Sequence, residues 1–509
     1  MKHRSLFILL TVLALLPFVT LSSGLVGNAA PAAVSFTLTR LTDNTAEDTR
    51  PTLAVDGAGK AHVAFERGGD IYYATNSSGA WVTTAISTDP ADEYRPAIAL
   101  DGSGQAHVAY FAGFPPNLDI YHATNAGGAW STEAVGNTSM PATWNLHLGL
   151  ALDGAGRAYI AYHTYDGADY EVNIRHQQSA RGTAPLGGWA TLIVTDNAVQ
   201  DEYPSIAVDG SGAIHVAYQS YDAAAFTYDV WYATYSGGAW NSGRVTDSAG
   251  LDDKAPSLAL DGAGQTHLAW EVAAAMADSE IGYASNASGA WVTTTLTANA
   301  EHDTSPSLAV DGSGQAHIAY EYYDGTQYHI HYTSNAGGAW ATDEVAAAPV
   351  QEAFLAANDH ALAVDGAGYV HVTYFADDGS DDEVWYARSD QPVGPPANHA
   401  PYVPSDPMPP DQAVGVGLED NVLSWSGGDP DAGDIVTYDI FFGVSTPPPL
   451  LQSGWPTTSL TVTLAAHTHY YWQVIARDDQ LGTGGPVWEF TTGGESESYF
   501  VYLPFVTKK

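Results

Sequence analysis

The sequence has no cysteine, few basic residues and, beyond its first 30 positions, no long apolar run. Without cysteine the chain forms no disulfides, so its stability must come from packed cores. Only 16 Lys and Arg stand against 58 Asp and Glu, which gives a formal net charge of −42. Such a surface repels nucleic acid and anionic membranes, and we expect neither as a partner. A spanning helix needs about 20 apolar residues, so we expect no membrane insertion once the N-terminal segment is removed.

The first 30 residues have the pattern of a secretory signal peptide. Lys2 and Arg4 give a positive start, residues 6–21 form an apolar core, and small residues follow at 29–32. These three features in this order predict cleavage and export. We therefore expect a secreted, extracellular or cell-surface protein.

Seven copies of a short motif organise the remaining chain, and the clearest copy is LAVDGSGQAHIAY at 308–320. In each copy an apolar run ends in Asp-Gly-x-Gly and a second apolar run follows. The motif aspartates are Asp56, Asp101, Asp153, Asp209, Asp261, Asp311 and Asp365, so successive spacings are 45, 52, 56, 52, 50 and 54 residues. A period near 50 with strand-like content predicts an all-β, seven-bladed β-propeller over residues 34–390.

The seventh repeat predicts how the ring closes. It contains three strand-like runs, ending in EVWYARSD, but lacks the Gly-Ala-Trp turn and the outer strand of the other repeats. An unassigned strand-like run, VSFTLTRL at 34–41, precedes the first repeat. We expect this N-terminal strand to complete the last blade, because closure removes free sheet edges.

A second domain is predicted after the propeller. Residues 391–410 are rich in proline and are expected to form a linker. Between 401 and 493 the chain carries further strand-like runs, which are LSW at 423–425, TYDIFFG at 437–443, YYWQVIARD at 470–478 and VWEFTT at 487–492. The early Trp and the Tyr-rich late strand resemble a fibronectin type III or related immunoglobulin-like module, which implies a β-sandwich. The tail at 494–509 has no assignment.

The turns before the outer strands resemble a degenerate Asp-box, the BNR repeat of sialidase-type propellers. An example is Asn-Ala-Gly-Gly-Ala-Trp at 125–130, with Asn in the Asp position. In that family the box is a fold-stabilising turn, so the resemblance implies a propeller. It does not imply sialidase activity, which needs an arginine triad, a Tyr–Glu nucleophile pair and an acid that we cannot assemble here.

Six repeats carry a histidine six residues after the motif aspartate. His and Asp are both metal ligands, which allows a metal interpretation. With one such residue in each blade, however, the ring holds them far apart. We therefore expect a structural hydrogen-bonding role. The six are His62, His107, His215, His267, His317 and His371, with Tyr159 in the remaining repeat.

Function is expected where the repeats differ, at the residue six positions before each motif aspartate, at the mouth of the central channel. The series is Arg50, Arg95, His147, Tyr203, Ala255, Ser305 and Asp359, and Tyr94 and Glu202 stand one position earlier. Two neighbouring arginines suit a carboxylate or sulfate. His147 and Tyr203 are candidate proton-transfer groups, and Asp359 is expected beside Arg50 across the closure. Alternatively, both arginines pair with loop acids such as Asp48, Asp92 and Glu93.

A calcium site is a further possibility in the seventh repeat. Asp377, Asp378, Asp381 and Asp382 supply oxygen ligands of the kind that Ca²⁺ prefers, although they match no complete loop motif. We expect no other cofactor.

Three functional hypotheses follow. The leading one is a non-catalytic binding protein that recognises carbohydrate or another surface polymer through the loop face of the propeller. The second is a polysaccharide lyase or glycoside hydrolase acting on an anionic polysaccharide. The third is a scaffold with a protein partner. Convergence of Arg50, Arg95, His147 and Tyr203 in one place favours the enzyme, whereas pairing of the arginines with loop acids argues against it.

Overall fold

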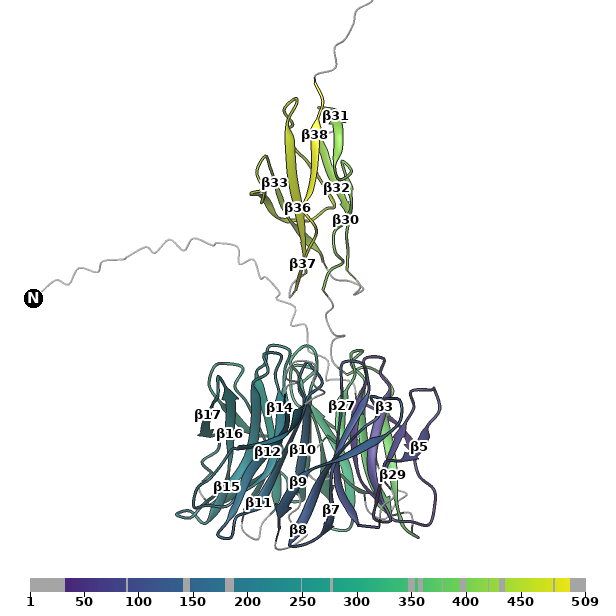
Figure 1. The fold of residues 1–509 in the computed structure, drawn as a ribbon, viewed down its shortest axis with the longest axis vertical. Coiled ribbons are helices and arrows are strands. Elements are labelled where there is room, and N and C mark those ends of the chain that lie inside the picture. The colour runs from purple at the N-terminus through teal and green to yellow at the C-terminus, as the bar shows by residue number, and fades with distance from the viewer. Residues whose placement is uncertain are drawn as a thin grey trace, which may run out of the picture. The chain divides into compact units, whose positions relative to one another are not determined.

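The computed structural model describes residues 33–494 apart from gaps at 88–89, 141–146, 179–186, 249, 275–277, 347–352, 356–359, 378, 394–399, 420, 430–434 and 479–480. The expected signal peptide and most of the expected tail therefore lie outside the described residues. Every regular element in the described part is a β-strand, and the strands form a propeller and a separate two-sheet sandwich (Figure 1). Among these residues no helix is long and apolar enough to cross a membrane.

The first four blades are four-stranded antiparallel sheets, written here from the innermost strand outward. Blade 1 is β2 (Asp48–Val55), β3 (Ala61–Arg67), β4 (Asp70–Thr75) and β5 (Val82–Ala85). Blade 2 is β6 (Glu93–Leu100), β7 (Ala106–Phe114), β8 (Asn117–Thr124) and β9 (Ser131–Ser139). Blade 3 is β10 (Leu148–Leu152), β11 (Ala158–Tyr165), β12 (Tyr170–Gln178) and β13 (Gly187–Ile193). Blade 4 is β14 (Asp201–Val208), β15 (Ile214–Asp222), β16 (Thr227–Ser236) and β17 (Ala239–Arg244).

The last three blades complete the ring. Blade 5 is β18 (Leu251–Leu260), β19 (Thr266–Ala274), β20 (Ser279–Ser285) and β21 (Val292–Thr295). Blade 6 is β22 (His302–Val310), β23 (Ala316–Tyr323), β24 (Tyr328–Ser334) and β25 (Ala341–Ala346). Blade 7 has a divided inner strand, β26 (Ala353–Phe354) and β27 (Leu362–Val364), followed by β28 (Val370–Asp377) and β29 (Asp382–Ser389). The prediction of a seven-bladed propeller is confirmed.

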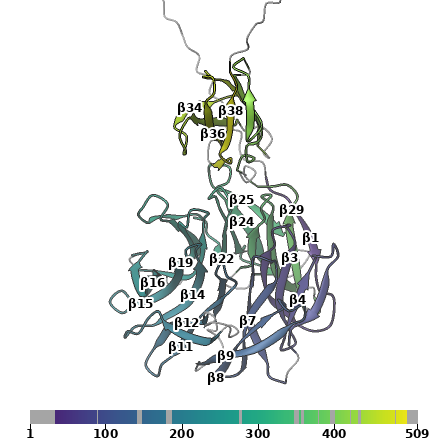
Figure 2. The same cartoon turned by 45° about the horizontal axis from the view of Figure 1, so that its top comes forward.

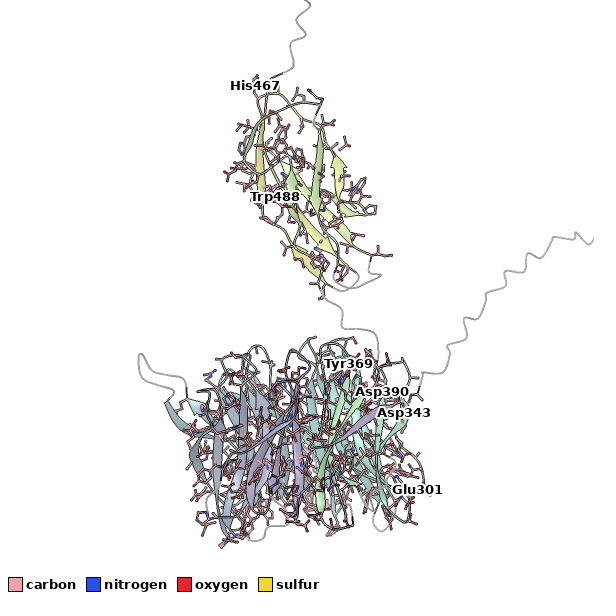
Figure 3. All side chains as sticks on the ribbon, turned by 90° about the vertical axis from the view of Figure 1, so that its right-hand side faces the viewer. Glu301, Asp343, Tyr369, Asp390, His467 and Trp488 are labelled. Carbon is pink, nitrogen blue, oxygen red and sulfur yellow. The ribbon has the colours of Figure 1, made fainter. Side chains whose placement is uncertain are left out.

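The N-terminal strand closes blade 7, as predicted. β1 (Phe36–Arg40) pairs antiparallel with β29, from Phe36 opposite Ser389 to Arg40 opposite Trp385, and the two lie side by side in Figure 2. Asp390, labelled in Figure 3, fixes the end of this pairing by accepting hydrogen bonds from the hydroxyls of Ser35 (2.7 Å) and Thr37 (2.6 Å). The strand that comes first in the chain therefore covers an edge formed some 350 residues later.

The motif aspartate builds the turn between the inner two strands of each blade. In blade 6 one oxygen of Asp311 accepts the N–H groups of Ser313 and Gln315, both at 2.9 Å. Gly314 takes a φ of 79°, a conformation that glycine adopts without steric penalty. The other oxygen of Asp311 lies 3.3 Å from Nε2 of His317, whose Nδ1 lies 2.6 Å from the Tyr332 hydroxyl. This Asp–His–Tyr chain joins the turn to the third strand.

This Asp–His–Tyr arrangement recurs in other blades, which gives the repeated histidines a structural role. The other His–Tyr contacts join His62 to Tyr73, His215 to Tyr232, His267 to Tyr283 and His371 to Tyr386, at 2.5–2.7 Å. In blade 2, His107 contacts His122 instead. In the turns before the outer strands the Asn oxygen accepts the first N–H of the second strand, as Asn125 does from Ala106 at 2.8 Å. These turns are fold-stabilising.

Aromatic rings join neighbouring blades. The Trp before or at the start of an outer strand packs edge-on against the Tyr of the preceding blade, as Trp130 does on Tyr73 (5.0 Å between ring centroids) and Trp340 on Tyr283 (4.9 Å). In the closing strand Phe36 takes this place against Tyr332, at 5.7 Å. Such edge-to-face pairs contribute about 0.5–1.5 kcal/mol beyond burial.

Serine hydroxyls join the inner strands of blades 4 to 7. Ser205 accepts the N–H of Leu258 at 3.0 Å, and Ser257 accepts that of Leu308 at 3.1 Å. Ser307, which is fully buried, accepts two N–H groups, from Ala361 at 3.0 Å and Leu362 at 3.2 Å. The inner strands of blades 5, 6 and 7 thus each have a backbone donor satisfied by the blade before.

The C-terminal domain is a sandwich of two sheets. One contains β30 (Ser405–Met408), β32 (Val422–Ser426) and β35 (Ser459–Thr461). The other contains β31 (Ala413–Val416), β33 (Thr437–Gly443), β34 (Leu450–Trp455), β36 (His469–Arg477), β37 (Gly482–Gly484) and β38 (Trp488–Thr492). Because β30 pairs with β32, the end of the expected 391–410 linker belongs to the sandwich.

The sandwich core lies between its sheets. Trp425 of β32 packs against Trp472 of β36 in one buried cluster, which also contains Trp488, labelled in Figure 3. The Tyr470 hydroxyl accepts the N–H of Ala465 at 2.9 Å, a contact like the tyrosine corner of immunoglobulin-like domains. The assignment to fibronectin type III stays a prediction.

Candidate functional site at the channel mouth

A backbone distortion marks the predicted mouth position in five blades. Arg50, Arg95, Tyr203, Ala255 and Ser305 all have positive φ values between 49° and 54°, and the register of the inner hairpin shifts at each of them. A non-glycine residue in this conformation costs about 1–3 kcal/mol, and such residues cluster at functional sites. The sequence pattern therefore located a structurally distinct position.

Blade 7 departs from this register. The residue with positive φ there is His360, at 51°, whereas the sequence count pointed to Asp359. Asp359 lies outside the described residues. The inner strand of blade 7 is described as two pieces, β26 and β27, whereas each of the other blades has one continuous inner strand.

Arg50 is neutralised, but by an acid that the sequence did not indicate. Its guanidinium forms an ion pair of 2.7 Å with Glu66 on β3, and the other oxygen of Glu66 accepts the N–H of Arg95 at 2.7 Å. The expected partner Asp48 is bound instead by Arg67, at 2.6 and 2.8 Å. Glu66 thus joins the Arg50 side chain of blade 1 to the backbone of blade 2.

Arg95 has no such partner. Among the described residues no acid lies within ion-pair distance of its half-buried guanidinium. Burial, followed by the positive charge of Arg50, lowers the pKa of Arg95, and Glu66 and Tyr203 partly oppose these effects. An arginine remains charged under all ordinary conditions, so this is a cation available to a ligand.

Tyr203 stacks near two buried histidines. Its ring centroid lies 5.6 Å from that of His147 and 5.9 Å from that of His163, and the histidines are only 3% and 1% exposed. Burial, then the charges of His163 and Arg95, lowers the pKa of His147 well below its ordinary value. Burial and then Glu202 raise the pKa of Tyr203. At neutral pH the His147 imidazole is therefore neutral, and the half-buried Tyr203 phenol beside it is protonated.

The remaining sequence candidates have other partners. The Tyr94 hydroxyl lies 3.5 Å from Asp92, and Glu202 is 3% exposed and accepts a hydrogen bond from Gln219 at 3.2 Å. Asp377 accepts the N–H of Gly379 at 2.6 Å in a local turn.

The proposed calcium ligands are only partly described. Burial and then Glu47 and Asp377 raise the pKa of Asp382 to about 6, and Asp381 accepts a hydrogen bond from Ser380 at 2.7 Å. Asp378 lies outside the described residues. Within the described ranges no group of three or more His, Asp or Glu side chains is arranged to hold a metal ion, so Ca²⁺ at this place stays a prediction.

The opposite side of the mouth is acidic. Glu321 on β23 accepts the N–H of Leu355 at 2.8 Å and the hydroxyl of Ser305 at 3.3 Å, and burial raises its pKa to about 8. Burial also raises the pKa of Glu271 on β19. The mouth thus has arginine, histidine and tyrosine side chains on blades 1–4, with Glu66 and Glu202 among them, and further buried carboxyl groups on blades 5 and 6.

Sequence reasoning missed the second-strand residues of this site. Each stands ten positions after a motif aspartate, inside a strand that is otherwise apolar or aromatic. The series is Glu66, Phe111, His163, Gln219, Glu271, Glu321 and Phe375. Five of these seven residues are polar, and this could have indicated the site from the sequence. Burying a polar group in an apolar strand is costly unless the group has a specific partner.

Inside the mouth the inner strands line an open cavity of about 400 Å³. Its lining includes one alanine from every blade and His360. The alanines are Ala54, Ala99, Ala151, Ala207, Ala259, Ala309 and Ala363. The side chains that line it are apolar apart from His360, so the charged side chains lie at the mouth.

Comparisons with known proteins support the fold. No protein-family model matches the sequence, and no curated protein matches it. Among solved structures, a polysaccharide lyase described as a PL25 ulvan lyase aligns at 14% identity and a TM-score of 0.51, covering 70% of this chain and 97% of that chain. The same kind of lyase bound to -[GlcA(1-4)Rha3S]- aligns at 13% identity and a TM-score of 0.50, with the same coverage. The propeller domain of the Trilobed protease from Pyrococcus furiosus aligns at 8% identity and a TM-score of 0.43, covering 69% and 96%. At these identities the likeness shows the β-propeller fold alone.

Proposed function

We propose that the protein binds an acidic polysaccharide at the channel mouth, with Arg95 as the anchoring cation. The observation that carries this proposal is the Arg95 guanidinium, which lacks an acid partner among the described residues although the chain has 58 acidic side chains. A cation left unpaired in so acidic a protein suits an anionic ligand. Arg50, held at 2.7 Å by Glu66, adds a second guanidinium whose exposed part faces solvent.

The chemistry of the mouth fits a sugar acid. A guanidinium binds a carboxylate or sulfate through two parallel hydrogen bonds, and an aromatic ring such as that of Tyr203 offers a face for a sugar ring. The acidic groups of blades 5 and 6 accept hydrogen bonds from hydroxyls. The bound saccharide of the fold neighbour, -[GlcA(1-4)Rha3S]-, carries both carboxylate and sulfate, and it supports the same ligand class here.

A polysaccharide panel tests the proposal. The chain without residues 1–30 is titrated with uronate-containing, sulfated and neutral polysaccharides by calorimetry at two salt concentrations. We expect acidic polymers to bind in a salt-sensitive manner, and Arg95→Ala to weaken binding about 10–100-fold, since a charge-assisted contact contributes about 1.5–3 kcal/mol. Lys60→Ala, at the Asp-Gly turn of blade 1, is the control and should change nothing. Equal binding of neutral polymers, or an unaffected Arg95→Ala variant, would refute the proposal.

A lyase reaction is the second candidate, favoured by the Arg95 cation and by the contact between the Tyr203 and His147 rings, whose centroids lie 5.6 Å apart. Arg95 would neutralise a uronate carboxylate, and a base would remove the proton from the adjacent carbon. The bond from the neighbouring carbon to the glycosidic oxygen then breaks, a carbon–carbon double bond forms, and an acid protonates the leaving oxygen. His147, whose pKa is lowered by burial, suits the base, and Tyr203, whose pKa is raised, suits the acid.

Turnover separates the two candidates. Any bound polymer is incubated with the protein and followed by the ultraviolet absorbance of unsaturated ends. A lyase requires product formation that Tyr203→Phe abolishes while binding stays within a few-fold. Binding without product formation would support the non-catalytic function. Absence of binding to every polysaccharide would favour a protein-binding scaffold.

A further inference from the structure

One boundary between blades departs from the aromatic packing that the other six share. At each of those six, an aromatic ring at the outer strand packs on a Tyr or His from the third strand of the preceding blade, with ring centroids 4.9–5.7 Å apart. The pairs are Trp81 with Tyr386, Trp130 with Tyr73, Trp189 with His122, Trp291 with Tyr232, Trp340 with Tyr283 and Phe36 with Tyr332. Between blades 3 and 4 the third-strand position holds Ile174, and Trp240 packs on Tyr235 of its own blade, at 5.1 Å.

Two neighbouring positions of the third strand change at the same boundary. Opposite the motif histidine, five blades have a Thr or Ser, whereas blade 3 has His176 opposite Tyr159. The five are Thr75, Thr124, Thr234, Ser285 and Ser334. The next residue is Asn in blades 1, 2, 5 and 6, where its side chain accepts an N–H of the second strand, but it is Gln177 in blade 3 and Tyr235 in blade 4. Larger side chains thus replace small turn residues on both sides of this boundary.

A pocket of about 400 Å³ lies where these departures meet. Its lining includes Arg157, Tyr159, His176 and Gln178 of blade 3, and Gly212 and Tyr235 of blade 4. Arg157 and Gly212 belong to Asp-Gly turns, at the opposite end of the inner strands from Tyr203, so the pocket lies on the face away from the channel mouth. Small-molecule sites typically have volumes of about 300–1,000 Å³, and this pocket falls within that range.

Aromatic rings from both blades line this pocket. Tyr159 and His176 are directly opposite each other on β11 and β12, and their nearly parallel rings have centroids 5.8 Å apart. Tyr235 contributes a ring from the blade 4 side. Gln178 is exposed, and its amide offers both hydrogen-bond donors and an acceptor. A sugar ring has apolar C–H faces and hydroxyl groups at its edge, so aromatic rings beside an amide suit it.

The charged group of the pocket is already neutralised. Arg157 donates through Nε to Asp153 at 2.6 Å, and its Nη2 lies 2.5 Å from the same carboxylate. Burial lowers the pKa of His176, so its imidazole is neutral at neutral pH. A pocket with these side chains favours an uncharged ligand, in contrast to the channel mouth with Arg95.

We propose that the pocket between blades 3 and 4 binds one uncharged sugar residue. The sugar packs against the aromatic rings, and Gln178 and the Tyr235 hydroxyl bond its hydroxyl groups. The repeat itself supports this proposal, because the pocket stands at the boundary where Ile174 replaces the aromatic partner of the next blade's Trp. This site has other residues, another face and another ligand charge than the channel mouth, so it does not rest on the function proposed above.

The test uses the chain without residues 1–30 and a panel of free neutral monosaccharides. Hexoses, 6-deoxyhexoses, N-acetylhexosamines and pentoses are screened by saturation-transfer NMR, and each sugar that binds is titrated by calorimetry at two salt concentrations. We expect at least one of them to bind with an affinity that salt does not change, since no net charge is involved. In hydrogen exchange read by mass spectrometry, the bound sugar should slow exchange over residues 174–178 and 212–216.

Tyr235→Asn is the decisive variant. It gives blade 4 the turn residue that blades 1, 2, 5 and 6 already have, so we expect it to fold, and a cooperative melting transition checks this. Because it removes an aromatic ring from the pocket, it should weaken sugar binding by about tenfold or more. Phe226→Asn makes the same change at a ring of blade 4 that is 78% exposed, and it should leave the affinity unchanged. Gln178→Ala, at an exposed side chain, should weaken binding several-fold and serves if Tyr235→Asn does not fold.

Three results would overturn the proposal. One is that no neutral monosaccharide binds, and another is that folded Tyr235→Asn and Gln178→Ala variants both bind the sugar as tightly as the unmodified chain does. The third is a sugar whose binding is lost in Arg95→Ala, because that sugar would lie at the channel mouth. Binding of acidic polysaccharides has no part in these results, so this proposal and the function proposed above can fail separately.

Discussion

Replacing Ser307 with alanine removes one oxygen and leaves two backbone N–H groups without an acceptor. The hydroxyl is fully buried and receives the N–H of Ala361 and of Leu362, so water cannot take its place. An orphaned buried donor costs about 1–3 kcal/mol. The second bond is longer, at 3.2 Å, and we assign about 2–4 kcal/mol to the whole change.

Two equivalent serines calibrate this value. Ser205→Ala and Ser257→Ala each free a single N–H, that of Leu258 or Leu308, and should cost about 1–3 kcal/mol. Thr52 occupies the same position in blade 1, but its hydroxyl has no partner among the described residues. Thr52→Val therefore removes an unpaired polar group at constant shape and should be neutral or stabilising.

Urea unfolding followed by tryptophan fluorescence measures the order of these variants. Hydrogen exchange read by mass spectrometry over residues 360–364 locates the effect, because the freed amides should lose protection first in Ser307→Ala. The reasoning fails if Ser307→Ala is no more destabilising than Ser205→Ala, or if Thr52→Val is as destabilising as either.

Three further predictions concern the ring as a whole. Burial and His122 lower the pKa of His107 to about 4, so below pH 6.5 the folded state binds fewer protons than the unfolded state. The neutral His107 therefore contributes at most about 3 kcal/mol of stability, which is lost as pH falls from about 6.5 towards 4. His107→Gln should make the urea midpoint depend less on pH over that range, although protonation of Asp303 near pH 6 stabilises the folded state and opposes the trend. Trp340→Phe should cost about 1 kcal/mol and Trp340→Ala distinctly more, because only the first keeps a ring against Tyr283, and equal unfolding midpoints for the two would contradict this packing role. Deleting residues 34–40 should expose the edge of β29 and produce oligomers in light scattering, whereas Asp390→Ala should only loosen the strand; a monomeric, equally stable deletion would show that closure is dispensable.

The sequence predicted the ring well because its signals are local. The Asp311 turn is closed by residues two and four positions away, and Gly314 supplies the conformation that the turn needs. The missing outer strand of repeat seven and the surplus strand at 34–41 then had one consistent solution, which the pairing of β1 with β29 confirms.

The site was less predictable because its pairings cross strands and blades. Counting back from Asp56 found Arg50, but its partner Glu66 comes from the opposing strand, at a register that the shift after Thr49 obscures. Counting back from Asp365 gave Asp359 in place of His360, which has the positive φ in blade 7. Whether Arg95 has an acid partner depends on distances that no spacing encodes.

The closing strand also orders events in time. β1 is the first strand of the propeller to be made, yet its partner β29 is the last, so the two ends must wait for everything between them. A contact between Phe36 and Ser389 carries a large loop-closure entropy and forms late. Until then the outer edge of blade 7 and the β1 segment are both unpaired, and each can capture the other from a neighbouring chain. Strand exchange between chains is therefore most favoured when partly folded molecules are present at high concentration.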